Sequence, residues 1–107
     1  MKGCSYMSSL PSEKILDAME DLLSVASDST RLKIMLSIAN EEHNVGEIVA
    51  LVGASQSLVS HQLEVLRKHR LVSVRKEGRK SYYILSDHHI NELIQVVYEH
   101  VSEKKGE

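Results

Sequence analysis

Residues 55–85 read SQSLVSHQLEVLRKHRLVSVRKEGRKSYYIL, and this stretch decides the fold. Its first part predicts a helix that ends at about residue 69 and has one apolar face. The residues of that face are Val59, Leu63 and Leu66. Two runs rich in β-branched and aromatic residues follow, 71–76 and 81–85, and the Gly-containing turn between them predicts a β-hairpin. A helix followed at once by such a hairpin is typical of a winged helix-turn-helix.

The helix that begins at Ser55 has the features of a recognition helix. A short helix ended by Gly53 precedes it, which completes a helix-turn-helix. Its polar N-terminal half offers a glutamine, which can pair with adenine or reach phosphate, and serines small enough to enter a major groove. An ordinary amphipathic helix would show the same apolar face, so this interpretation depends on the neighbouring elements. The residues expected to face the groove are Gln56, Ser57, Ser60 and His61.

The charge of the chain is unevenly distributed. Its formal net charge is −2, which by itself does not favour binding to nucleic acid. Between residues 67 and 80, however, only Glu77 opposes a run of basic residues, which are Arg67, Lys68, Arg70, Arg75, Lys76, Arg79 and Lys80. Such a patch on an acidic body is typical of phosphate binding, whereas the alternative is a solvated charged loop. The residues expected to contact phosphate or the minor groove are Arg75, Arg79 and Lys80.

Capping residues and apolar spacing predict three helices before the recognition helix. Ser12 opens the first, and Asp28 caps the second. After a loop at 40–43, Asn44 and Glu47 have the spacing of a capping box for a short third helix. The first helix has an apolar stripe at helical spacing, formed by Ile15, Leu16, Met19, Leu22, Leu23 and Ala26. The apolar positions expected to be buried are Leu32, Ile34, Met35, Leu36 and Ile38 in the second helix, and Ile48, Leu51 and Val52 in the third.

A last helix is predicted from Asp87 to about Glu103, with a buried stripe formed by Ile90, Leu93, Ile94, Val97 and Val101. Its ends carry four side chains of types that bind transition metals, in the spacing D-x-H-x10-H-x2-E. His100 and Glu103 lie three residues apart and share a helix face. His89 and His100 lie about 16 Å apart along the helix axis, so a single ion cannot be bound from both ends of one helix.

The spacing therefore indicates an antiparallel pair of these helices in a homodimer with two symmetric metal sites. Each site would take Asp87 and His89 from one chain and His100 and Glu103 from its partner. Two imidazoles and two carboxylates suit Zn(II) first and Co(II) second. The alternative is that these side chains are only solvated and that Asp87 is a helix cap. His88 is expected to point away from this site. The remaining histidines, not expected to be ligands, are His43, His61 and His69.

The length of 107 residues suits one domain, placed at 12–103 between a disordered segment at 1–11 and a frayed tail at 104–107. No apolar run approaches the roughly 18 residues of a membrane span, and no signal peptide is expected. The single cysteine, Cys4, excludes an intrachain disulfide and fits a cytoplasmic protein. Because no Gly-rich phosphate loop, positioned nucleophile or open three-ligand metal site is present, neither an enzyme nor a small-molecule substrate is expected.

With these features together, residues 12–103 resemble the ArsR/SmtB family of bacterial metal-responsive repressors. The stretches that carry the resemblance are 26–34 (ASDSTRLKI), 55–63 (SQSLVSHQL) and the wing at 78–83. The resemblance implies an α+β, mostly helical winged-helix fold, in the order of four helices, two strands and a last helix. It also implies a homodimer formed through the first and last helices. The zinc-sensing ligand pattern of the family maps onto Asp87, His89, His100 and Glu103.

The resemblance further implies a mechanism. A metal-free dimer would bind an inverted-repeat operator and block transcription, and Zn(II) binding would release the DNA and derepress genes for metal efflux or sequestration. Family members that sense cadmium, lead or arsenic carry a Cys-x-Cys pair where this chain has Asn44 and Gly46, so sensing of soft metals is not expected. We also hypothesise that a ligand histidine bonds through its second ring nitrogen to backbone near Arg70. The alternatives are a repressor of the same fold that responds to Co(II), Ni(II) or a non-metal signal, and a DNA-binding protein without any metal response.

Overall fold

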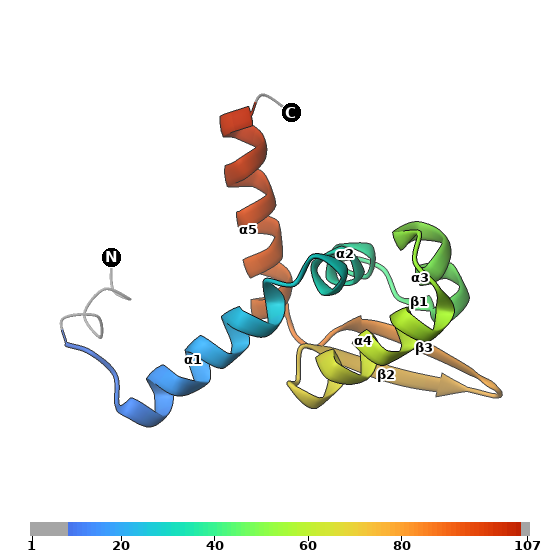
Figure 1. Cartoon of the computed structure of the whole chain (residues 1–107), viewed down its shortest axis with the longest axis horizontal. Coiled ribbons are helices and arrows are strands. Elements are labelled where there is room, and N and C mark those ends of the chain that lie inside the picture. Colours follow the sequence, from blue (N-terminus) through green and yellow to red (C-terminus); the bar gives the residue numbers. More distant parts are fainter. Residues whose placement is uncertain (1–8, 106–107) are drawn as a thin grey trace.

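The structure, a computed structural model, describes residues 9–105 (Figure 1). Its elements are α1 (Glu13–Ala26), α2 (Ser29–Ser37), β1 (His43–Asn44), α3 (Val45–Val52), α4 (Gln56–Lys68), β2 (Val72–Glu77), β3 (Lys80–Leu85) and α5 (His88–Lys105). This order confirms the predicted winged helix-turn-helix. The loop expected at 40–43 is partly wrong, because His43 begins a short strand that pairs with β3. Cys4, most of the segment predicted to be disordered and the end of the predicted tail lie outside the described residues.

Side-chain caps fix where the first helices begin. The predicted caps are Ser12, Asp28, Asn44 and Ser55, and each accepts a hydrogen bond from the backbone N–H three residues further on. At α3 the capping box is reciprocal, since the Glu47 carboxylate also accepts from the Asn44 N–H at 3.0 Å. Gly53 ends α3 with a φ of 76°, a left-handed conformation that glycine adopts without steric cost. This tight end sets the turn between α3 and α4.

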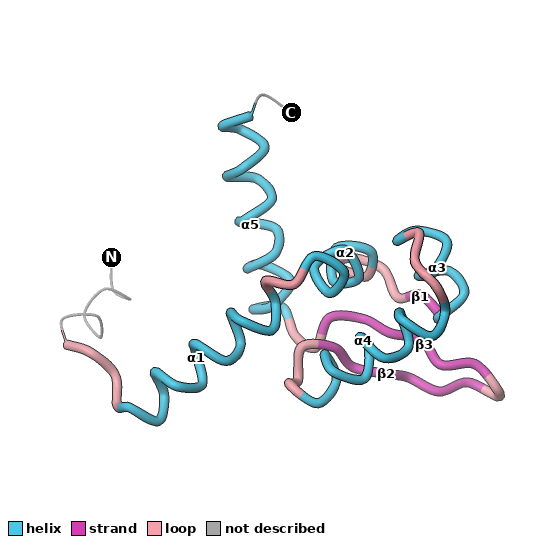
Figure 2. Tube along the Cα trace, in the orientation of Figure 1, coloured by secondary structure: helices cyan, strands magenta, loops and turns pink. Residues whose placement is uncertain are grey.

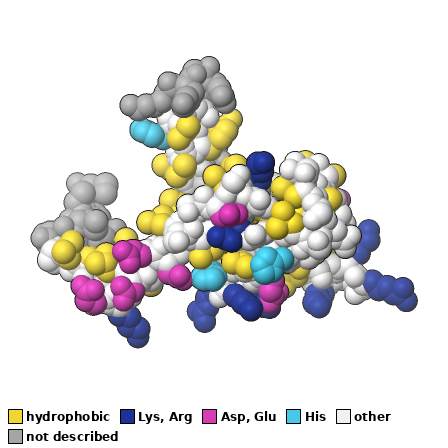
Figure 3. All heavy atoms as spheres, viewed as in Figure 1, with side chains coloured by type: hydrophobic (Ala, Val, Ile, Leu, Met, Phe, Trp, Pro, Cys, Tyr) yellow, Lys and Arg dark blue, Asp and Glu magenta, His cyan; other side chains and the backbone are white. Residues whose placement is uncertain are grey.

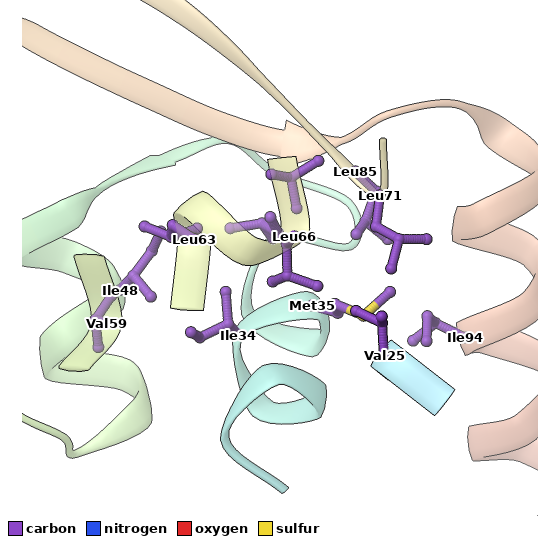
Figure 4. Close-up of a cluster of buried hydrophobic side chains, with 12 residues drawn as sticks. Val25, Ile34, Met35, Ile48, Val59, Leu63, Leu66, Leu71, Leu85 and Ile94 are labelled. Carbon is purple, nitrogen blue, oxygen red and sulfur yellow. The ribbon is translucent and has the colours of Figure 1, made fainter. Parts of the chain in front are cut away.

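The helices α2, α3 and α4 pack around one hydrophobic core, which β2, β3 and Ile94 of α5 close (Figure 4). Its fully buried side chains are Ile34, Met35, Ile38, Ile48, Val59, Leu63, Leu66 and Leu71. Most of the predicted apolar faces of these helices are therefore confirmed. The prediction is wrong for Leu36 and Leu51, which are 44% and 61% exposed, because both line a surface groove between α2 and α3.

The strands form an antiparallel sheet in the order β1-β3-β2. Val72 and Leu85 are paired across β2 and β3 and are both buried, so the base of the hairpin packs on the core. The hairpin turns at Gly78, whose φ is 61°. Figure 2 shows the hairpin extending beyond α3 to a tip that projects into solvent. The fold therefore presents α4 and the hairpin tip as neighbouring exposed features.

The first and last helices extend away from the core (Figure 1). The apolar stripes predicted for both helices are present, but the stripe of α5, predicted to be buried, is only partly buried in a single chain. Leu23 of α1 is 54% exposed and Val97 of α5 is 47% exposed, because no other element within residues 9–105 covers these faces. Together with α2, the two stripes line an apolar groove of about 580 Å³. No helix within residues 9–105 is both long enough and apolar enough to cross a bilayer.

Candidate functional site

The polar side of α4 is exposed along the N-terminal half of the helix. The residues predicted to face the DNA groove are all exposed, and they are Gln56, Ser57, Ser60 and His61. The opposite side of α4 carries the buried apolar face, so helical periodicity turns these four away from the core. Ser57 Oγ lies 3.5 Å from the capping Ser55 Oγ. The structure thus brings the predicted groove-facing residues together on one surface.

Arg31 of α2 connects this helix with α1. Its Nε donates to the backbone oxygen of Val25 at 2.7 Å, near the end of α1. Its Nη1 donates to Oε1 of Gln62 on α4 at 2.8 Å. The backbone N–H of Arg31 is itself bound by the capping carboxylate of Asp28 at 3.1 Å. One guanidinium therefore holds three helices in register, which fixes the orientation of α4 relative to α1.

The three hairpin residues predicted to contact phosphate differ in whether their charges are already paired within the protein. Within residues 9–105, no carboxylate oxygen lies within 4 Å of the side-chain nitrogens of Arg79 or Lys80. Arg75, in contrast, bonds to the carboxylates of Glu42 and Glu77. The hydrogen bonds that Arg75 donates to Glu42 and Glu77 raise the pKa of Arg75. The hydrogen bond from Arg75 to Glu42 also lowers the pKa of Glu42. Fewer unpaired charges are therefore available on the hairpin than the sequence suggests.

The charges of the two ends of the molecule differ in sign. Figure 3 shows Lys and Arg side chains gathered below α4 and along the hairpin to its tip, and Asp and Glu side chains gathered on α1. The acidic surface of α1 includes Asp17, Glu20 and Asp21. A basic face that joins an exposed polar helix to a basic hairpin fits an interface with a nucleic-acid backbone.

The first pair of predicted metal ligands lies at the start of α5. Asp87 caps the helix, because its Oδ1 accepts from the Ile90 N–H at 3.0 Å. Nδ1 of His89 lies 3.9 Å from the same oxygen, and both side chains are largely exposed. The cap uses one oxygen, so the second carboxylate oxygen of Asp87 can still bind a ligand. The capping alternative and the ligand role are thus compatible at this residue.

The second pair lies at the other end of α5, where His100 and Glu103 are exposed one turn apart. In one chain the structure brings together no group of three or more potential metal ligands within residues 9–105. The donor set itself, two imidazoles and two carboxylates at exposed positions, fits a four-coordinate Zn(II) or Co(II) ion. A site with all four ligands therefore needs α5 of a second chain.

Three other histidines have surroundings that the sequence did not reveal. The expectation that His88 points away is wrong, because its ring lies 4.3 Å from that of His89, centroid to centroid. His43 lies between the carboxylates of Glu41 and Glu47, at 3.7 and 3.2 Å, rather than in an unstructured loop. His69 bonds to the Val65 carbonyl oxygen at 2.9 Å and lies 3.5 Å from Asp21 of α1.

Sequence reasoning missed two residues that connect the site elements. Glu42 binds Arg75 from 33 positions away. Asn91 of α5 donates to the side-chain oxygen of Asn40, which follows α2, at 3.2 Å. Both contacts join segments that are distant in sequence, so no local spacing predicts them. Glu42 can be recognised only from the folded structure, which shows which acidic residues lie close to the hairpin.

Comparison with known proteins gives consistent matches. Residues 28–74 match the family described as bacterial regulatory protein, arsR family. The chain is 40% identical over 85 residues to the transcriptional repressor SmtB homolog of Synechocystis sp., which covers 79% of this chain and 64% of that protein. It is 30% identical over 100 residues to the HTH-type transcriptional repressor SmtB of Mycobacterium tuberculosis, which covers 94% of this chain and 74% of the relative.

A solved structure shares the architecture. The homodimeric winged helix-turn-helix DNA-binding domain of Mb0332 from Mycobacterium bovis superimposes with a TM-score of 0.76 at 25% sequence identity. The match covers 87% of this chain and 93% of that chain. The similarity thus extends beyond the helix-turn-helix to most of the described residues.

Proposed function

Because the chain belongs to the ArsR family of bacterial regulatory proteins, we propose that its dimer represses transcription from an inverted-repeat operator and releases the DNA on binding Zn(II). Members of this family are DNA-binding transcriptional regulators and not enzymes. The protein would act in the cytoplasm, and the genes that it regulates would serve metal efflux or sequestration. The ligand residues would be Asp87, His89, His100 and Glu103.

The DNA-binding part of the proposal is supported by the exposed side of α4 and by the hairpin tip. Gln56, Ser57, Ser60 and His61 share an exposed surface, where they could reach base edges or phosphate. Arg79 and Lys80 carry charges at the hairpin tip that form no ion pair within residues 9–105. Helix and tip together suit a major groove and the adjacent backbone.

The single observation that carries the dimer and the metal site is the distribution of ligands and apolar residues on α5. The helix exposes an apolar stripe, including Val97 and Val101, that requires a covering surface. The four predicted ligands divide between its two ends, so an antiparallel partner helix would complete two sites at once. The homodimeric state of Mb0332 is consistent with this arrangement.

The coupling between metal and DNA requires that metal binds the free dimer more tightly than the DNA-bound dimer. When bound, Zn(II) would supply a link between the α5 helices of the two chains. The hypothesised bond from a ligand histidine to backbone near Arg70 has a suitable acceptor. The Arg70 carbonyl oxygen accepts one bond from Ser86 Oγ at 2.7 Å, and a carbonyl oxygen can accept a second. Such a bond would connect the metal helix with the end of α4.

The alternative within the same fold is a repressor whose signal is Co(II), Ni(II) or a non-metal ligand. The donor set does not separate these metals, because selectivity depends on geometry and supply as much as on ligand type. Titration with each metal in turn distinguishes these signals.

Titration of Zn(II) into the protein bound to fluorescent DNA from its own promoter tests the proposal. We expect release near one Zn(II) per chain, since two chains share two sites. Asp87→Asn, which retains the capping oxygen of α5, and His100→Gln should bind the operator without metal but should no longer release it. Glu99→Gln, a change next to His100 outside the ligand set, is the matched control. Operator binding that is indifferent to Zn(II) would contradict the zinc response, and Co(II) and Ni(II) would be titrated next.

A further inference from the structure

The side chain of Arg75 crosses the sheet to reach Glu42. Arg75 lies on β2 opposite Tyr82 of β3, and its guanidinium carbon lies 4.8 Å from the centre of the Tyr82 ring. Glu42 directly precedes β1, on the other side of β3. Nε of Arg75 donates to the two carboxylate oxygens of Glu42 at 3.1 and 3.3 Å, and its Nη2 donates to Oε1 as well. The guanidinium thus lies over an aromatic ring and is bound by a carboxylate from a distant segment.

A second carboxylate completes the arrangement. Nη1 of Arg75 donates to Glu77 Oε1 at 2.9 Å. Arg75 and Glu77 are two positions apart on β2 and therefore project from the same side of the hairpin. Two negative charges then accompany one positive charge at this point of the basic face. Arg79 and Lys80, at the tip, form no ion pair with a carboxylate within residues 9–105, although Lys80 lies opposite Glu77 in the register of β2 and β3.

A DNA phosphate would compete with Glu42 for the same donors. Carboxylates and phosphates both accept the paired N–H groups of a guanidinium, so Arg75 can serve only one of them fully at a time. Moving Arg75 to a phosphate would break its bonds to Glu42 and leave that carboxylate unpaired beside the DNA. Both effects oppose DNA binding.

We propose that Glu42 is an affinity-setting residue of the DNA interface, which withholds Arg75 from the phosphate backbone. The inference rests on the proposed DNA-binding function and concerns only duplex affinity, not the metal response. Arg79 and Lys80 contribute their charges to DNA binding, whereas the charge of Arg75 is neutralised by its ion pairs with Glu42 and Glu77. Glu42 therefore keeps binding weaker and less sensitive to salt than the number of basic residues would give.

Glu42→Gln and the matched control Glu41→Gln test this inference. Each removes one negative charge, but Glu41 makes no contact with Arg75 and is 79% exposed. Affinity for promoter DNA and for a mixed-sequence duplex would be measured without metal at several salt concentrations. One added phosphate contact steepens the salt dependence by about 0.9, which corresponds to about eightfold tighter binding at about 0.1 M salt. We expect this gain on both duplexes for Glu42→Gln and a change of less than about twofold for Glu41→Gln.

A double-mutant cycle with Arg75→Gln shows whether the gain acts through Arg75. The Glu42→Gln gain should disappear in the Arg75→Gln background, and circular dichroism would confirm that each variant is folded. A gain that persists without Arg75, or one equal to that of Glu41→Gln, would overturn the inference and leave the ion pair as a sheet contact only. If the wild-type protein showed no preference for promoter DNA while the Glu42→Gln gain held on both duplexes, the repressor function would fail and the inference would stand.

Discussion

At the scale of single residues, the surroundings of a charged side chain decide its role more than its identity does. Arg75 and Arg79 belong to the same hairpin, four positions apart. Arg75 is held by Glu42 and Glu77, whereas Arg79 is exposed at the tip. The sequence assigned both to phosphate, and only Arg79 keeps the surroundings that this assignment needs.

Arg79→Gln should weaken DNA binding about equally for all sequences and reduce the salt slope by about one, because one phosphate contact is lost. Gln56→Ala is the informative contrast, since loss of a base contact should alter sequence preference with little change in slope. Fluorescence anisotropy over a salt series measures both. An unchanged salt slope for Arg79→Gln would remove Arg79 from the phosphate contacts.

Arg70, which follows the C-cap of α4 at His69, has a strained left-handed conformation. Its φ is 61°, and the Leu71 N–H bonds to the Leu66 carbonyl oxygen at 2.9 Å, the pattern of a Schellman cap that glycine usually occupies. Arg70→Gly should therefore stabilise the fold by about 1 kcal/mol. Chemical denaturation measures the change. Arg70→Ala removes the same charge but keeps a Cβ, so it should show no such gain, and equal stabilities for the two would contradict the argument.

At the scale of elements, helix ends follow from local sequence, while the angles between helices depend on a few long-range contacts. Caps such as Asp28 and Ser55 act within three residues and were predictable from spacing. The orientation of α4 relative to α1, in contrast, depends on Arg31, whose partners Val25 and Gln62 lie 6 and 31 positions away.

Arg31→Met should reduce stability by about 2 kcal/mol, because two hydrogen bonds to a charged donor are lost. DNA affinity should fall further than stability alone explains, since α4 would lose its fixed orientation. Thermal unfolding and anisotropy on the same samples measure the two effects. Lys33→Met, which removes an exposed charge from the same helix, serves as control and should change neither by much.

At the scale of the whole molecule, two apolar helix faces are left uncovered within residues 9–105. The stripes of α1 and α5 remain exposed, and they line an apolar groove of about 580 Å³. In a monomer these surfaces would stay in contact with water at a cost of about 25 cal/mol per Å² of apolar area. A partner chain would bury them and would bring the two halves of each predicted metal site together.

Val97→Glu should therefore give a folded monomer that binds operator DNA weakly, because a charge would enter the groove where the partner packs. Sedimentation velocity measures the oligomeric state, and circular dichroism checks the fold. Gln95→Glu adds the same charge at an exposed polar position of α5 and should stay dimeric. A Val97→Glu dimer as stable as wild type would place the interface elsewhere.

Much of this architecture could be read from the sequence because its signals are local. The turn at Gly53, the capping box at Asn44 and the hairpin around Gly78 each depend on residues within a few positions. The spacing of the four predicted ligands on α5 likewise needed only the geometry of a helix. The exposure of Leu36 and Leu51 could not be read in this way, because periodicity places a residue on a face but does not say what covers it.

The order of helices and strands, the exposed polar side of α4 and the division of the predicted ligands between the two ends of α5 all follow from the amino-acid sequence. These depend on hydrogen bonds and periodicities within a helix or a hairpin. Three contacts, in contrast, come from the tertiary structure: Arg75 is bound by Glu42, Arg31 joins α1 to α4, and the His88 ring lies beside that of His89 at a tilt of 31°. Packing and electrostatics act between atoms that are close in space, and for the first two contacts the chain brings those atoms together from distant positions.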